Sequence, residues 1–172
     1  MQTLTPRLTW TLLSMFSASA VLASLILTHW LDLEPCHLCI FQRLLFMVLA
    51  LLATFAALAQ SSGGPRLAIR LSGLTFLILA ATGSGVAAYQ SWLQWQPADT
   101  VSCVGGQLGL IEQLVEWLGQ QSPSLFLASG FCEDRELAIL GLSLANLAFV
   151  AFTLALALAA WALWRGWRSQ GV

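Results

Sequence analysis

Charge is scarce in this 172-residue sequence: only 9% of the residues are Asp, Glu, Lys or Arg, and lysine is absent altogether. A soluble domain carries charge on about a quarter of its residues. Because 58% of the residues are hydrophobic and the mean hydropathy is +0.79, polar side chains are too few to cover a water-facing surface. The composition therefore excludes an ordinary soluble domain, and a net charge of −1 gives no sign of nucleic-acid binding.

Long apolar runs are what the sequence has instead. A bilayer core of about 30 Å needs about 20 helical residues, and four runs reach that length. We therefore predict an all-α membrane protein, a single domain built as a bundle of four transmembrane helices. The predicted spans are approximately residues 8–31, 40–59, 70–92 and 137–163.

The first run also contains Ala18-Ser19-Ala20, which looks like a signal-peptide cleavage site. The apolar stretch continues well past it, whereas the apolar region of a signal peptide has only about 7–15 residues. We therefore expect this segment to remain as the first span.

Arginine is segregated from the acidic residues, and this sets the expected orientation. Arginines flank the spans on one side, whereas the acidic residues fall in the loops at 32–39 and 93–136 on the other. Membrane-protein segments rich in arginine and lysine lie on the cytoplasmic side of the membrane, so we predict that both termini are cytoplasmic. The arginines on the predicted cytoplasmic side are Arg7, Arg66, Arg70, Arg165 and Arg168.

Tryptophans cluster near the ends of the apolar runs, where interfacial anchors are expected. Small residues four apart on the third run, Ala80 with Ser84 and Ala81 with Gly85, favour close helix contact. The tryptophans in question are Trp10, Trp30, Trp92, Trp95, Trp161, Trp164 and Trp167.

The second far-side loop contains an amphipathic segment at 107–118. Apolar residues recur there at helical spacing, while Glu112, Gln113 and Glu116 take the other face. The segment is too short and too polar to span, so we predict a short interfacial helix. The alternative is a loop helix packed on the top of the bundle. The apolar positions are Leu108, Ile111, Leu114, Val115 and Leu118.

Every cysteine falls in the two far-side loops. Cys36-His37-Leu38-Cys39 is a Cys-x-x-Cys motif at the start of the second span, where a helix N-terminus stabilises a thiolate. Between Cys103 and Cys132 lie 28 residues, a spacing that suits a loop-closing disulfide. Four cysteines in one oxidising compartment indicate disulfide chemistry.

Other interpretations of these cysteines are a structural disulfide or a metal site. A four-cysteine zinc site would normally use two short-spaced pairs, and only one is present. Haem attachment is excluded because Ile40 follows Cys39 where histidine would be required. His37 either raises thiolate character or is simply solvated.

Arg43 lies one helical turn after Cys39, close to the apolar zone, where an arginine is costly. Arg43 is interpreted as the electrostatic partner of a Cys39 thiolate and of an oxygen on a bound acceptor. Gln42 is a candidate hydrogen-bond donor to the same acceptor. The alternative is an interfacial arginine that snorkels without a partner.

The stretch from Glu34 to Arg43, read as EPCHLCIFQR, resembles the first-loop signature of the DsbB family of disulfide-generating membrane proteins. The second cysteine pair, the following Leu140-Gly141-Leu142-Ser143 and the four-helix topology extend the resemblance over most of the chain. It implies an inner-membrane enzyme that reoxidises a periplasmic DsbA-like dithiol protein and passes the electrons to ubiquinone or menaquinone.

The resemblance also implies roles for the cysteines. Cys103 would form the mixed disulfide with the partner, and Cys132 would then attack Cys36. Cys39 would remain as the thiolate facing the quinone, with Arg43 stabilising it. Three departures from the pattern are His37 in place of proline, Tyr89-Gln90 in place of Arg-His, and Ala145 with Leu147 in place of Pro-x-Trp.

Two rival functions stay open at this point. A relative of vitamin K epoxide reductase also combines four helices, a Cys-x-x-Cys motif and a quinone, but its motif is expected on a later helix. A tetraspan structural protein would use the disulfides only as staples, and such staples need no cation like Arg43.

Overall fold

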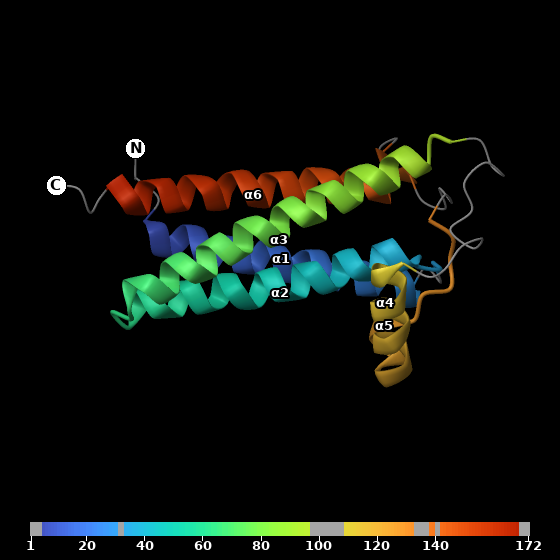
Figure 1. The fold of residues 1–172 in the computed structure, drawn as a ribbon, viewed down its shortest axis with the longest axis horizontal. Coiled ribbons are helices and arrows are strands. Elements are labelled where there is room, and N and C mark those ends of the chain that lie inside the picture. Colours follow the sequence, from blue (N-terminus) through green and yellow to red (C-terminus); the bar gives the residue numbers. More distant parts are fainter. Residues whose placement is uncertain (1–4, 31–32, 97–108, 133–137, 140–141, 169–172) are drawn as a thin grey trace.

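The chain forms a bundle of four long helices, seen in a computed structural model that describes residues 5–30, 33–96, 109–132, 138–139 and 142–168 (Figure 1). All four are long and apolar enough to cross a membrane. The predicted all-α membrane bundle is therefore confirmed. The long helices are α1 (Pro6–Trp30), α2 (His37–Ser61), α3 (Arg66–Leu93) and α6 (Leu144–Arg168).

The ends of the bundle differ in what they carry. The start of α1, the end of α6 and the turn between α2 and α3 lie together at one end, and the start of α2 lies at the other (Figure 1). The α2–α3 turn is tight because Gly63 adopts a positive φ of 66°, which glycine tolerates without steric cost. The Cys-x-x-Cys motif is therefore a bundle's length away from the start of α1 and the end of α6.

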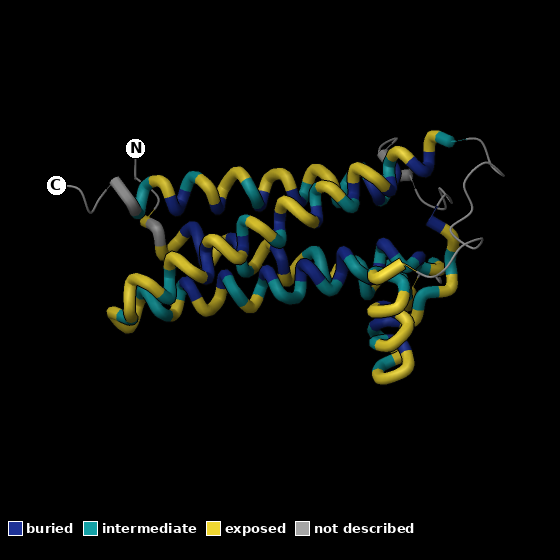
Figure 2. The backbone as a smooth tube through the Cα atoms, in the orientation of Figure 1, coloured by how far each residue is buried: buried dark blue, intermediate teal, exposed yellow. Residues whose placement is uncertain are grey.

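The core consists of aromatic residues, leucines and alanines, and buried positions lie where the helices face one another (Figure 2). Phe46 of α2 stacks on Phe152 of α6 with ring centroids 4.0 Å apart, and Trp10 meets Phe76 edge-on at 5.6 Å. Alanines on α2, α3 and α6 are fully buried and allow close helix approach.

Two of the packing predictions are wrong in detail. Trp10 is only 2% exposed, so it is a core residue and not an interfacial anchor, whereas Trp30, Trp92, Trp95 and Trp164 are exposed as predicted. On α3, Ala80 is buried in the core as predicted and Ser84 is half-buried, whereas Ala81 and Gly85 are exposed. Gly73 and Gly83, which were not predicted, lie directly against α6 side chains.

The fourth span begins later than the predicted residue 137. Two-residue strands β1 (Ala138–Ile139) and β2 (Leu142–Ser143) pair antiparallel, and α6 starts after them. The physical reason is a helix cap: Ser143 Oγ accepts the backbone N–H of Asn146 at 3.3 Å. Serine at this position satisfies an N–H that the first helical turn leaves unpaired.

Two short helices lie crosswise at the cysteine end of the bundle (Figure 1). They are α4 (Leu110–Gln121) and α5 (Pro123–Phe126), so the predicted amphipathic helix is confirmed. Ile111, Val115 and Leu118 of α4 pack around Ile40 of α2. The predicted apolar face is split, because Leu114 points outward with Leu110 and Trp117.

Candidate functional site

The site is built on the first turn of α2. Cys36 is the N-cap residue, and its Sγ accepts the backbone N–H of Cys39 at 3.4 Å. This cap brings the two sulfurs together, and the Cys36 thiol donates to Cys39 Sγ at 3.2 Å. Cys36 is buried and Cys39 is half-buried. The Cys36 side chain is therefore enclosed by protein, while the Cys39 side chain stays partly accessible.

The second loop brings a third sulfur to this pair. Cys132 is buried in the same cluster as Cys36, Leu38 and Leu93, and its side chain hydrogen-bonds with that of Cys36. This bond, with a smaller contribution from the bond to Cys39 and from burial, raises the pKa of Cys36 far above the ordinary thiol range. The surroundings of Cys36 therefore favour its protonated form. The fourth cysteine, Cys103, lies outside the described residues.

A buried glutamine on α3, Gln90, contacts the sulfurs and is held by a second buried glutamine, Gln42 on α2. Gln90 is only 3% exposed, and its Nε2 donates to Cys39 Sγ at 3.1 Å and to Cys36 Sγ at 3.4 Å. Its Oε1 accepts from Gln42 Nε2 at 2.8 Å. The bond from Gln42 fixes the orientation of the Gln90 amide, so that its N–H groups point at sulfur.

Arg43 is buried, with 3% exposure, and it connects three parts of the chain. Its Nε donates to Ser24 Oγ at 2.9 Å and its Nη2 to Thr28 Oγ1 at 2.6 Å, both on α1. Its Nη2 also reaches the Ser24 carbonyl oxygen at 3.3 Å, and its Nη1 donates to the Leu125 carbonyl oxygen of α5 at 2.7 Å. The alternative of an interfacial arginine without a partner is therefore wrong. Arg43 also interacts electrostatically with Cys39.

A cavity of about 320 Å³ opens beside these groups, within the range of small-molecule sites. Most of its wall is apolar and comes from α1, α2 and α6. Polar groups gather where Cys36 and Cys39 reach it. They are Glu34, Gln42, Arg43, Gln90 and Gln94 together with Ser24 and Thr28.

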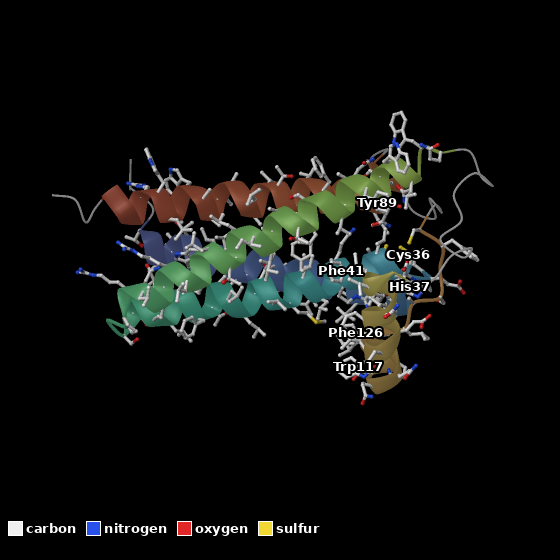
Figure 3. All side chains as sticks on the ribbon, in the orientation of Figure 1. Cys36, His37, Phe41, Tyr89, Trp117 and Phe126 are labelled. Atoms are coloured by element: carbon white, nitrogen blue, oxygen red, sulfur yellow. The ribbon has the colours of Figure 1, made fainter. Side chains whose placement is uncertain are left out.

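The structure thus brings Cys36, Cys39, Cys132, Gln42 and Arg43 of the predicted site together. His37 sits beside Cys36 at the start of α2, near the end of α3 that carries Tyr89 (Figure 3). His37 makes no hydrogen bond within the described part of the chain.

Sequence reasoning missed Gln90 as a contact to the cysteines. It registered only as a departure from Arg-His, yet an amide inside an apolar span is itself a signal, because a buried amide must find hydrogen-bond partners. It also missed Ser24, Thr28 and the Leu125 carbonyl as partners of Arg43. Nothing in the sequence marks a backbone carbonyl 82 residues away as a partner of Arg43.

Comparison with known proteins agrees with this geometry. Residues 6–162 match the family model described as disulfide bond formation protein DsbB. The relatives named disulfide bond formation protein B include one from Dechloromonas aromatica that is 41% identical over 71% of this chain and 70% of its own length. Another, from Albidiferax ferrireducens, is 39% identical over 89% of this chain and 84% of its own. The chain is therefore a multi-pass membrane protein of disulfide bond formation, and it belongs to the DsbB family.

Proposed function

We propose that the chain is a thiol:quinone oxidoreductase that reoxidises a periplasmic DsbA-like dithiol protein and delivers the electrons to a membrane quinone. The observation that carries this proposal is the meeting of Cys36, Cys39 and Cys132 beside a largely apolar cavity. Three sulfurs in one cluster allow a disulfide to be exchanged from one pair to another, whereas a purely structural disulfide would need only two.

The proposed sequence consists of disulfide exchanges followed by one oxidation. A thiolate of the reduced partner attacks Cys103, so that a partner–Cys103 bond forms and Cys132 leaves as a thiolate with the bonding electron pair. Cys132 attacks Cys36, so that a Cys132–Cys36 bond forms, the Cys36–Cys39 bond breaks and Cys39 leaves as a thiolate.

Two further exchanges complete the transfer. The second partner thiolate attacks its own sulfur in the mixed disulfide, and the oxidised partner departs while Cys103 is released as a thiolate. Cys103 then attacks Cys132, which restores their disulfide and leaves Cys36 and Cys39 reduced. The two electrons and two protons taken from the partner now reside on the Cys36–Cys39 pair.

The cavity fits a quinone by size and by chemistry. Apolar walls suit the ring and its tail, and Gln42 and Arg43 offer donors at the end where Cys39 lies. A guanidinium has five N–H groups, and Arg43 uses four of them within the described residues, which leaves one on Nη1 for a quinone oxygen. When bound there, ubiquinone or menaquinone would supply the oxidising power by accepting two electrons and two protons.

Gln90 and Arg43 have complementary roles in this proposal. The Gln90 amide donates to the Cys39 sulfur, and a hydrogen bond to a charged acceptor is among the stronger ones in proteins. Arg43, one helical turn after Cys39 and lining the same cavity, supplies positive charge. Together they stabilise a Cys39 thiolate at the cavity wall.

The proposed location is the bacterial inner membrane with both termini cytoplasmic. It rests on the segregation of arginine, since α1 starts and α6 ends at the bundle end opposite Cys36 (Figure 1). A membrane-impermeant thiol reagent should label reduced Cys103 from the periplasmic side of intact inner membranes, whereas Cys132 is buried and is not the residue to follow. Labelling that requires permeabilisation of that membrane would reverse the orientation.

The relay is tested by trapping its intermediate. Cys132→Ser should accumulate a covalent complex between Cys103 and a reduced DsbA-like partner, because the cysteine that resolves it is gone. Cys103→Ser should accumulate none. A partner adduct on Cys36 or Cys39 would show that the second pair is structural.

A further inference from the structure

The second loop is attached to the first by backbone hydrogen bonds just before the reacting cysteines. The N–H groups of Ser129 and Gly130 both donate to the Pro35 carbonyl oxygen, at 3.1 and 3.3 Å. A carbonyl oxygen has two lone pairs and accepts both. Pro35 directly precedes Cys36, and Gly130 stands two residues before Cys132, so this contact sets how the two sulfurs approach each other.

Gly130 is required in this contact because no other residue fits. A Cβ at this position would lie 2.0 Å from the Glu34 carbonyl oxygen and 2.9 Å from the Glu34 carbonyl carbon. Both are backbone atoms, which cannot swing aside as a flexible side chain would. The φ of Gly130 is not positive, so the requirement comes from close approach alone.

We propose that this backbone contact, which we call the loop clamp and define as Ser129 and Gly130 on Glu34 and Pro35, positions Cys132 for attack on Cys36. The inference rests on the proposed relay and adds the element that sets its internal step. In that step the Cys132–Cys36 bond forms, the Cys36–Cys39 bond breaks, and Cys39 takes the electron pair. Gly130 is a positioning residue, since it acts through the placement of Cys132.

The geometry of a disulfide explains why a small shift matters. Its two Cα atoms must lie about 4.4–6.8 Å apart with the Cβ atoms facing each other. A methyl group at residue 130 has to push the second loop off the Glu34 backbone, which moves Cys132 with it. A misplacement of about 1 Å at a reacting centre costs roughly 100-fold in rate.

The test measures the Cys132–Cys36 reaction without partner or quinone. In the full chain carrying Cys39→Ser and Cys103→Ser, only Cys36 and Cys132 remain, and diamide should join them rapidly, as read by gel shift and mass spectrometry. Adding Gly130→Ala should slow the joining roughly 10- to 100-fold. Gly85→Ala is the matched control, because a Cβ there meets no atom within 4 Å.

A second variant covers the case in which Gly130→Ala destabilises the loop. One glycine inserted between Phe131 and Cys132 leaves the loop clamp intact and displaces only the cysteine, and it should slow the joining similarly. The same insertion between Ser61 and Ser62, at the other end of the bundle, should not. An unchanged rate in both Gly130→Ala and the Phe131–Cys132 insertion would overturn the loop clamp and leave the relay standing. Failure of the parent to join Cys36 to Cys132 would overturn the relay itself.

Discussion

Gln90 provides a sharp test of the site, because it contacts the sulfur that is proposed to face the quinone. Gln90→Met keeps the length of the side chain and removes the amide that donates to Cys39 Sγ at 3.1 Å. A hydrogen bond to a charged group contributes about 1.5–3 kcal/mol, and a factor of ten corresponds to about 1.4 kcal/mol, so quinone reduction should slow roughly 10- to 150-fold.

The assay is single-turnover reduction of quinone by protein whose thiols have been reduced chemically, so that no partner enters the measurement. Visible absorbance from a thiolate beside bound quinone gives a second readout of the same sulfur. Both should weaken in Gln90→Met. A rate within about twofold of the parent, in a variant that is folded, would refute the role of the Gln90 amide; this margin is well below the smallest loss expected for a hydrogen bond to a charged group.

A thermodynamic cycle separates this effect from simple loss of stability. Gln90→Met also leaves the buried Gln42 amide without its acceptor, which should cost about 1–3 kcal/mol of folding free energy. The double variant with Gln42→Met replaces both amides by apolar groups and should recover most of that stability, and Gln42→Met alone completes the cycle. Recovery of the quinone reduction rate together with stability would show that Gln90 acts through packing only.

Three further predictions concern Arg43, the Cys36 thiol and the packing of α3 on α6. Arg43→Ala should raise the KM for quinone at least tenfold. Arg43→Lys should restore only part of the quinone affinity, because lysine lacks the planar fork of donors. An unchanged KM in Arg43→Ala would show that Arg43 only connects α1 with α5. Because the pKa of Cys36 is raised, the rate of alkylation of Cys36 in reduced protein should keep increasing above pH 9, and a rate that levels off near pH 8.5–9 would contradict this. The reduced protein should also lose folding stability as pH rises past the ordinary thiol pKa, because unfolding then releases a proton from Cys36. Gly83→Ala places a Cβ 2.4 Å from the Phe152 ring and should lower stability by about 1–3 kcal/mol, measured as the Tm in detergent, whereas Gly85→Ala should not.

Hydropathy and residue spacing were sufficient to predict the four spans, because a bilayer requires each to be long and apolar. They did not predict that α6 starts at Leu144. The apolar run 137–163 continues through β1 and β2, and hydropathy cannot separate a short apolar hairpin from the start of a helix. The informative signal was Ser143, a residue that favours the N-cap position and precedes the uninterrupted helical pattern.

The helix faces were harder to predict than the helices. Trp10 near the end of a span fits an interfacial anchor equally well as a core residue, and only its contact with Phe76 of α3 decides between them. The same holds for Gly83, whose role depends on Phe152, a residue 69 positions later in the sequence. Pairing between helices is a property of the packed bundle, and hydropathy patterns do not record it.

The candidate site divides along the same physical line. Cys36, Cys39 and Arg43 follow one another at spacings of three and four residues along one face at the start of α2, so their proximity follows from helix geometry. The approach of Cys132 and Gln90 depends on contacts between distant segments: a carbonyl that accepts two N–H groups, and an amide held by another amide. Such contacts still leave a trace in the sequence, since each places a residue where its general properties argue against it. Gln90 lies in an apolar span, and Gly130 stands two residues before a buried cysteine at a position where no positive φ requires glycine. A polar residue in a membrane helix or an unexplained glycine near a reactive cysteine is therefore a reason to look for a partner before the structure is known.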